Sequence, residues 1–261
     1  MDLGLKDKVI IVTGGAKGIG EAISKLVAAE GAIAVIAGRS AVDNEKTIAA
    51  IKAAGGKAFG IEAELGDPAA CKKVIDITVK EFGTLHALVN NAGVNDGVGL
   101  ESGNPEKFMA SLQKNVSHYY NLAHYALPYL KQNKGSIVNI GSKVATTGQG
   151  NTSGYAASKG AINALTREWA VELLPFSIRV NTVIPAEVWT PLYETWISSL
   201  PNPKEKLASI VSKIPLEQRM TTSEEIAGMT VFLLSAQSSH TTGQIIYVDG
   251  GYTHLDRSIS Q

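Results

Sequence analysis

Cysteine is nearly missing from this chain of 261 residues, which contains only Cys71. An intramolecular disulfide is therefore excluded, and a lone thiol is typical of a reducing compartment. We expect a cytoplasmic protein for this reason. Cys71 lies between Ala70 and Lys72 in a helical pattern, which favours a half-buried helix residue over a catalytic thiol.

Net charge and long apolar runs are also lacking. Lys plus Arg and Asp plus Glu each total 24, whereas proteins that bind nucleic acid or membrane surfaces electrostatically carry a basic excess. The longest apolar runs have the length of strands, and the first residues, MDLGLKDK, do not resemble a signal peptide. We therefore expect no nucleic-acid partner, no membrane partner, no transmembrane span and no signal peptide.

Histidine is scarce and scattered along the chain. Its positions share no spacing that would gather several rings on one helix face, so we predict no metal site. The five histidines are His86, His118, His124, His240 and His254. Apolar residues, in contrast, make up 44% of the chain, which is enough for one large core, and we predict a single domain over residues 1–261.

A glycine-rich loop between a strand and a helix is the strongest pattern near the start. Residues 9–12 are apolar and β-branched, as in a strand that is covered on both faces, and residues 22–30 have helical spacing. Between them Gly14, Gly18 and Gly20 remove Cβ atoms, so phosphate oxygens could approach backbone N–H groups at the helix N-terminus. The spacing is not that of the commoner dinucleotide motif or of a P-loop. It predicts a dinucleotide site, with an ordinary glycine-rich turn as the alternative.

The end of the second predicted strand, residues 32–37, favours one cofactor. At this position an acidic side chain would bind the ribose 2′-OH of NAD, whereas an arginine suits the 2′-phosphate of NADP. The chain has Gly38 and Arg39 here, with no carboxylate before Asp43, and Lys17 can add a second positive charge. We therefore predict NADP, with NAD as the alternative cofactor and a solvated surface role as the alternative for Arg39.

Strands and helices alternate along the chain, which predicts an α/β fold with right-handed crossovers and a doubly wound parallel sheet. Glu64 and Leu65 follow the third strand, where an adenine ring could rest. Asp67 has the features of a helix N-cap before Pro68. The third to seventh strands are predicted at residues 57–62, 87–90, 136–140, 178–184 and 245–248, and one long helix at 105–132.

Tyr155 and Lys159 open a predicted helix four residues apart and therefore share one face. An ordinary tyrosine has a pKa of about 10 and is a poor base at neutral pH. A nearby ammonium, joined by an oxidised nicotinamide, would lower that pKa. The isolated pattern is weak, and an exposed surface pair is the alternative.

Several motifs together, in order and spacing, resemble the short-chain dehydrogenase/reductase family over nearly the whole chain. They comprise Thr13-Gly14, Gly18-Ile19-Gly20, Asn90-Asn91-Ala92-Gly93, Asn115, Ser142, Tyr155, Lys159 and Val248-Asp249-Gly250-Gly251. The resemblance implies a seven-stranded Rossmann sheet flanked by helices, hydride transfer between NAD(P) and an alcohol or carbonyl, and a homotetramer.

The resemblance also assigns roles. Tyr155 would be the catalytic acid/base, Lys159 would lower its pKa and hold the nicotinamide ribose, and Ser142 would bind the reacting oxygen. Asn115 would support a water in the proton relay. The predicted cofactor-binding residues are Gly14, Lys17, Gly18, Ile19, Gly20, Arg39, Glu64, Leu65, Asn91, Ala92, Gly93, Tyr155, Lys159, Pro185, Val188 and Thr190.

Polar side chains after the strands suggest a sugar substrate, because hydroxyls need paired donors and acceptors while a C–H face stacks on aromatic rings. The family commonly has Pro-Gly after the sixth strand, but this chain has Pro185-Ala186-Glu187. Residues 187–215 would form the substrate lid. The predicted substrate-binding residues are Asn95, Ser142, Lys143, Gln149, Asn151, Tyr155, Glu187 and Trp196.

Residues 93–97, 148–155, 185–188 and 249–257 further resemble family members that oxidise the C1 hemiacetal of L-fucose to its lactone. Two other functions stay open at this point. The first is reduction of a 3-oxoacyl thioester, against which the polar loops argue. The second is a cofactor-binding regulator without turnover.

Overall fold

Seven parallel strands form one sheet in the order β3-β2-β1-β4-β5-β6-β7 in the computed structural model, which describes residues 2–255. This order confirms the predicted α/β fold with a doubly wound Rossmann sheet. The strands are β1 (Val9–Thr13), β2 (Ile33–Gly38), β3 (Lys57–Glu62), β4 (Ala87–Asn90), β5 (Ser136–Ile140), β6 (Arg179–Pro185) and β7 (Ile245–Val248). The second and sixth strands were each predicted one residue too early. The others begin where the sequence predicts.

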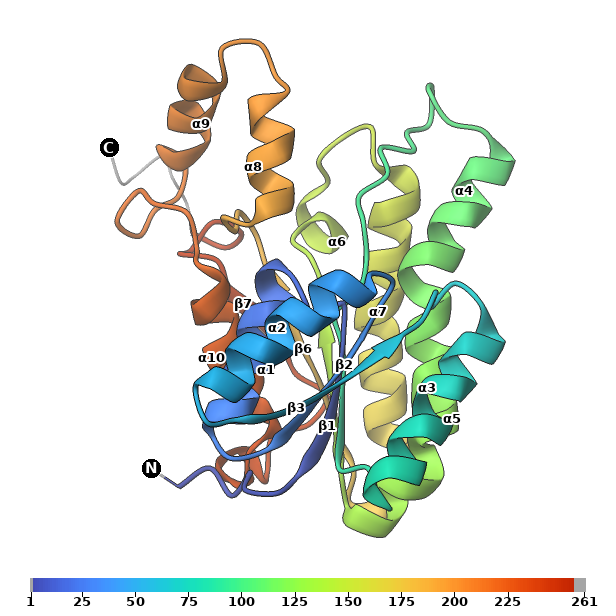
Figure 1. The fold of residues 1–261 in the computed structure, drawn as a ribbon. Helices are drawn as coiled ribbons and strands as arrows, with labels where there is room; N and C mark the ends of the chain where they lie inside the picture. The colour runs from blue at the N-terminus through green and yellow to red at the C-terminus, as the bar shows by residue number, and fades with distance from the viewer. Residues whose placement is uncertain (1, 256–261) are drawn as a thin grey trace.

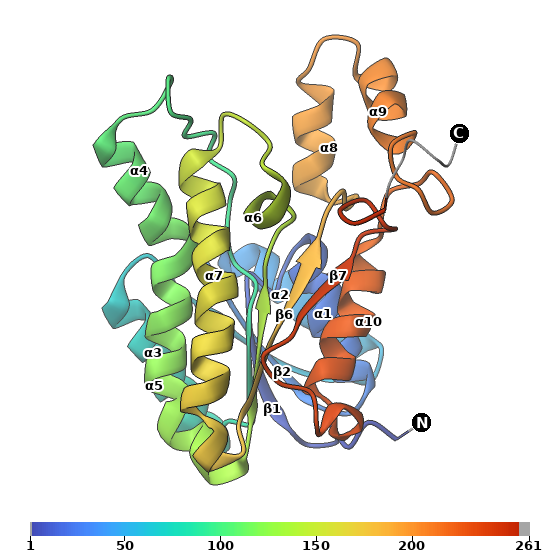
Figure 2. The same ribbon diagram turned by 180° about the vertical axis from the view of Figure 1, so that it is seen from behind.

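Helices cover both faces of the sheet (Figures 1 and 2). One face carries α1 (Gly18–Ala29), α2 (Ala41–Ala53) and α10 (Ser223–Leu234), and the other carries α3 (Pro68–Phe82), α5 (His118–Asn133) and α7 (Ser153–Glu172). Because both faces are covered, the central strands are mainly apolar, and all five residues of β1 are buried. Asp67 caps α3 as predicted, its carboxylate accepting from Ala69 N at 2.9 Å. Cys71 is fully buried, where a half-buried residue was expected.

The predicted long helix at residues 105–132 is interrupted. It consists of α4 (Pro105–Leu112), a π-helical turn (Gln113–Ser117) and α5. In the π turn, the Asn115 side chain donates from Nδ2 to the carbonyl of Ser111 at 3.0 Å. Such widened turns are common at functional sites, and no apolar periodicity reveals them.

Two short helices, α8 (Pro191–Ser198) and α9 (Pro203–Val211), project beyond the carboxyl ends of the strands (Figures 1 and 2). They lie within the predicted lid. Thr190 caps α8, its hydroxyl accepting from Tyr193 N at 3.2 Å. The remaining helical segments are α6 (Val144–Thr147) and the 3₁₀ turns Leu174–Phe176 and Ala236–Ser238. No helix within residues 2–255 has both the length and the apolar character needed to cross a membrane.

Candidate active site

The glycine-rich loop folds tightly over the end of β1. Gly14 N donates to Ala37 O at 2.8 Å, and a Cβ atom on Gly20 would lie only 2.1 Å from Gly14 O. Gly18 has φ +53°, and its Cβ would lie 3.2 Å from Thr190 Cγ2. The loop therefore needs glycine at these positions, and it meets Thr190, the N-cap of α8 in the predicted lid. A bare backbone at the start of α1 fits a dinucleotide phosphate.

Hydrogen bonds join the segment after β4 to this loop. Asn91 Nδ2 donates to Thr13 O at 2.8 Å, and the Thr13 hydroxyl accepts from the backbone N–H groups of Asn91 and Ala92 at 2.8 and 3.0 Å. The predicted cofactor residues from the two strands therefore lie together. Thr13 holds them, a positioning role that the sequence analysis did not assign.

Each cation predicted to bind a 2′-phosphate has an acidic neighbour. Lys17 Nζ lies 2.7 Å from Asp43, and Arg39 lies 3.7 Å from Glu64 with both side chains largely exposed. The ammonium of Lys17 lowers the pKa of Asp43 by hydrogen bonding. A phosphate at this position would compete with these carboxylates for the cations. The pairing of Arg39 with Glu64 was not predicted, because Glu64 follows the neighbouring strand and is distant from Arg39 in the sequence.

Tyr155 and Lys159 share a face of α7 as predicted, with Lys159 Nζ 5.5 Å from the centre of the Tyr155 ring. Lys159 is buried, and its ammonium donates to Ile140 O at 2.8 Å and to the Tyr119 hydroxyl at 3.3 Å. That hydroxyl itself donates to Ile140 O at 3.0 Å. Tyr119 is therefore a second tyrosine beside the lysine. It was missed because nothing in its sequence neighbourhood distinguishes it from a core aromatic residue.

Asn115 reaches the same group of residues. Its Oδ1 accepts from Val94 N at 2.7 Å. A Cβ atom on Gly93 would lie 3.1 Å from Asn115 Oδ1 and 3.7 Å from Lys159 Nζ. The structure thus brings together residues from the β4 loop, the π turn and α7, as the sequence analysis expected for a proton relay.

Burial dominates the pKa values of this group. It raises the pKa of Tyr155 to about 12, although a hydrogen bond with Ser142 acts in the opposite direction, and it lowers the pKa of Lys159 to about 7. In the protein without cofactor, desolvation therefore determines the direction of the Tyr155 pKa shift, whereas the predicted lowering includes the positive charge of an oxidised nicotinamide and stays a prediction. Stabilisation of the phenolate requires a further positive charge in the site.

Apart from Ser142 and Tyr155, the predicted substrate residues fall into two groups. Lys143 and Glu187 form a buried ion pair, and the second carboxylate oxygen of Glu187 accepts from the Tyr193 hydroxyl at 2.8 Å. Trp196 packs on Tyr193 with ring centres 5.1 Å apart. The other group is exposed in the loops after β4 and β5. It consists of Asn95, Gln149 and Asn151.

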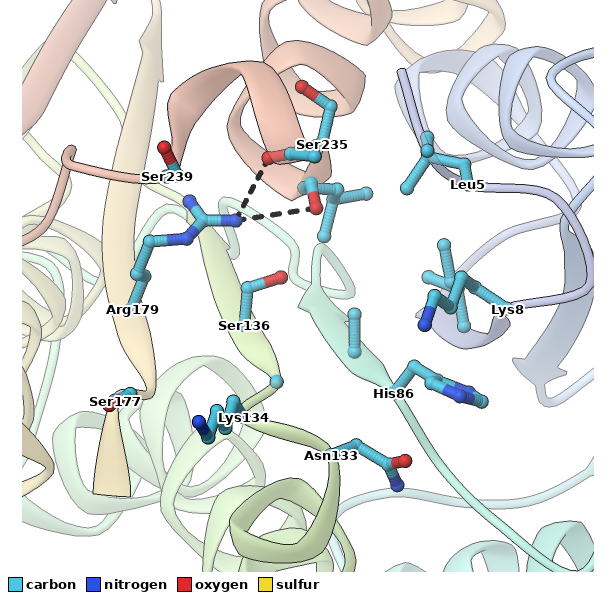
Figure 3. A pocket seen from close by; sticks show the side chains of 16 residues that line it. Leu5, Lys8, His86, Asn133, Lys134, Ser136, Ser177, Arg179, Ser235 and Ser239 are labelled. Carbon is cyan, nitrogen blue, oxygen red and sulfur yellow. Dashed lines mark hydrogen bonds between the residues drawn. The ribbon is translucent and has the colours of Figure 1, made fainter. Parts of the chain in front are cut away.

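A cavity of about 360 Å³ lies at the opposite edge of the sheet (Figure 3). Its lining includes residues that come just before the strands, among them Lys8 and His86. Arg179, at the start of β6, donates to the carbonyls of Leu233 and Ser235 at the end of α10. Ligands of parallel sheets bind beyond the carboxyl ends of the strands, so this cavity is separate from the candidate active site. Within residues 2–255 no group of three or more potential metal ligands is gathered.

Comparison with known proteins places this arrangement among oxidoreductases. Residues 14–253 match the family model described as enoyl-(acyl carrier protein) reductase. The chain is 37% identical to the 3-oxoacyl-[acyl-carrier-protein] reductase FabG of Thermotoga maritima over 95% of this chain and 98% of that protein. It is 33% identical to L-fucose dehydrogenase of Rattus norvegicus over 94% and 88% of the two chains.

Two solved structures are similar over almost the whole chain. The Cj0485 dehydrogenase is 46% identical, with a TM-score of 0.94 and 99% of each chain covered. The ligand-free aldohexose dehydrogenase AldT of Thermoplasma acidophilum is 32% identical, with a TM-score of 0.89 and 98% of each chain covered.

Proposed function

Because the chain belongs to the short-chain dehydrogenase/reductase family of NAD(P)-dependent oxidoreductases, we propose that it oxidises the C1 hydroxyl of a sugar to the lactone. The proposed substrate is L-fucose or an aldose with related ring stereochemistry, and the proposed hydride acceptor is NADP. The observation that carries this proposal is the largely buried Lys143–Glu187 pair. Lys143 directly follows Ser142, and Glu187 lies two residues after Pro185. An acyl chain would require an apolar slot at that position.

Two kinds of similarity support a sugar. L-fucose dehydrogenase and aldohexose dehydrogenase are among the relatives with nearly full coverage. The loops at 93–97, 148–155 and 185–188 also resemble those of bacterial L-fucose dehydrogenase. The resembling tail at 249–257 is described only as far as residue 255, so Asp256 and Arg257 lie outside the described residues.

In the proposed mechanism Ser142 and Tyr155 bind the C1 hydroxyl, and Tyr155 accepts its proton. An oxidised nicotinamide held by the glycine-rich loop and Lys159 would supply the hydride acceptor for C1 and a positive charge near the phenol. Lys159 holds the nicotinamide ribose and, with Asn115, passes the proton onward. The hydrogen bonds of Lys159 to Ile140 O and Tyr119 hold its side-chain nitrogen 5.5 Å from the centre of the Tyr155 ring, which supports this role.

Reduction of a 3-oxoacyl thioester is the second candidate. The match to an acyl-carrier-protein reductase model and the identity with FabG favour it. If the enzyme reduces an acetoacetyl thioester with NADPH faster than it oxidises any aldose with NADP, thioester reduction would replace the sugar reaction as its function.

The experiment that tests the proposal is the initial rate of nicotinamide reduction with L-fucose, measured with NADP and NAD in parallel. We expect turnover with both cofactors and a higher kcat/KM with NADP. Binding of NADPH without turnover of L-fucose or related aldoses would contradict the sugar proposal. We also propose the homotetramer that the family resemblance implies, which sedimentation equilibrium would test.

Replacing Arg39 with aspartate should shift cofactor preference toward NAD. The new carboxylate would repel a 2′-phosphate and accept from a 2′-OH, next to Glu64. We expect the ratio of kcat/KM for NAD to that for NADP to rise about 10-fold or more, a change of ~1.4 kcal/mol. Lys52→Asp, an exposed change on α2, is the control. An unchanged ratio would mean that Arg39 does not bind the phosphate.

A further inference from the structure

Four side chains from four separate segments meet beside Ser142, and we refer to them as the polar clasp. Lys143 follows β5, Glu187 follows β6, Tyr193 belongs to α8, and Tyr252 follows β7. Lys143 pairs with one carboxylate oxygen of Glu187, and Tyr193 donates to the other. The ammonium of Lys143 also lies 4.1 Å from the centre of the Tyr252 ring.

The two charged side chains of the clasp are largely buried. The side chains of Lys143 and Glu187 are only 10% and 12% exposed. Burying two charges costs solvation energy that is recovered only when the pair is well formed and its remaining polar atoms have partners. Both oxygens of Glu187 have protein partners here, so Glu187 is placed to orient Lys143, and the aromatic face of Tyr252 provides a further favourable contact for the ammonium.

The clasp lies next to the proposed reacting group. Lys143 follows Ser142 directly, and its backbone N–H donates to Pro185 O at 3.0 Å, which fixes the β5 and β6 loops against each other. Tyr252 is held in a turn in which Asp249 accepts from Gly251 N and Thr253 N, both at 2.9 Å. Since Lys143 and Glu187 together have no net charge, the clasp suits a neutral polyhydroxylated ligand better than an anion.

We propose that Lys143 is a specificity-determining residue that hydrogen-bonds a ring hydroxyl of the neutral sugar, and that Glu187 is a positioning residue acting through it. This inference rests on the proposed function. It replaces a direct contact of Glu187 with sugar by an indirect role. It also makes the site depend on the lid, through Tyr193, and on the segment after β7, through Tyr252.

A double-mutant cycle tests the proposal, with Lys143→Met, Glu187→Gln and the double variant compared with the unmodified enzyme. Hydrogen bonds to charged groups are worth about 10- to 100-fold in an equilibrium constant, so we expect each single change to lower kcat/KM for neutral aldose by about that factor. The double variant should have a kcat/KM for neutral aldose no lower than that of Lys143→Met, because Glu187 has no role without Lys143. The dissociation constant of NADPH should not change.

The ion pair Lys72–Asp76 on α3 provides a matched control, because Lys72 Nζ lies 2.7 Å from Asp76 Oδ2 but both side chains are exposed. Lys72→Met and Asp76→Asn should leave kcat/KM unchanged. Thermal unfolding of every variant checks that it is folded. The Tyr193→Phe variant keeps the aromatic ring, and we expect it to raise KM for the aldose more than it lowers kcat. Effects of Lys143→Met and Glu187→Gln that multiply in the double variant would overturn the positioning role.

A second measurement separates recognition from a purely structural role. Glu187→Gln leaves Lys143 with uncompensated positive charge, so the ratio of kcat/KM for a hexuronate to that for the neutral aldose should rise about 10-fold. An unchanged ratio would overturn the assignment of Lys143. Failure of the unmodified enzyme to oxidise any neutral aldose would instead overturn the proposed function, so the two failures are distinguishable.

Discussion

Replacing Tyr155 with phenylalanine is expected to lower kcat for aldose oxidation by about 1,000-fold or more, in the upper part of the range for loss of a general acid/base. The phenylalanine ring keeps the shape of the side chain and removes only the hydroxyl that Ser142 contacts. The initial rate with saturating NADP and aldose measures the loss. The dissociation constant of NADPH should change less than about threefold, because the glycine-rich loop is untouched.

Tyr129→Phe, on the outer helix α5, is the matched control and should retain full activity. A Tyr155→Phe variant with more than a tenth of the original kcat would show that another group accepts the proton. Tyr119 would then be the next residue to change, since its hydroxyl lies 3.3 Å from Lys159 Nζ.

Replacing Lys159 with methionine should make the protein more stable and nearly inactive. Burial lowers the pKa of Lys159 from 10.5 to about 7, so between these pH values the unfolded chain binds the extra proton. Burial of Lys159 therefore lowers the free energy of unfolding. This loss is absent above about pH 10.5, grows as the pH falls and is constant below about pH 7. At pH 8 it amounts to about 3 kcal/mol, because one pKa unit corresponds to ~1.4 kcal/mol.

Methionine has a similar volume and carries no charge, so it removes this cost. The carbonyl of Ile140 keeps the Tyr119 hydroxyl as a donor. We expect Tm at pH 8 to rise by about 5–10 °C, and the difference to shrink toward pH 10.5. We also expect kcat to fall at least about 100-fold, as for other catalytic groups held at a cost in stability.

Thermal unfolding followed at several pH values tests the stability part, with Lys52→Met, an exposed change on α2, as the control. A Tm for Lys159→Met that equals or falls below that of the unmodified protein at pH 8 would contradict the cost of burying this lysine.

The sheet could be predicted from the sequence because its signal is local. Residues 87–90, 136–140 and 245–248 are mainly apolar runs of strand length, residues 57–62 have a weaker pattern, and each segment forms a strand with those bounds. The glycine spacing and the four-residue step from Tyr155 to Lys159 are equally local. These patterns sufficed to place the loop, the β4 end and α7 at one edge.

The remaining features depend on contacts between distant segments. Nothing near residue 64 indicates that Glu64 pairs with Arg39, and nothing near residue 187 indicates that Glu187 is shared by Lys143 and Tyr193. The π turn at Asn115 is compatible with the same apolar spacing as a continuous helix. Desolvation of Tyr155 also follows only from the assembled fold, and for that reason the raised pKa of this residue in the protein without cofactor was not predicted.

The proximity of Gly18 to Thr190 bears on the order in which the two substrates bind. A nucleotide on the glycine-rich loop would lie next to Thr190, which caps α8, so it can order α8 before the sugar arrives. We therefore expect a compulsory-order mechanism in which the nucleotide binds first and leaves last. In product-inhibition kinetics, NADPH should compete with NADP, whereas the lactone should be competitive with neither the nucleotide nor the aldose.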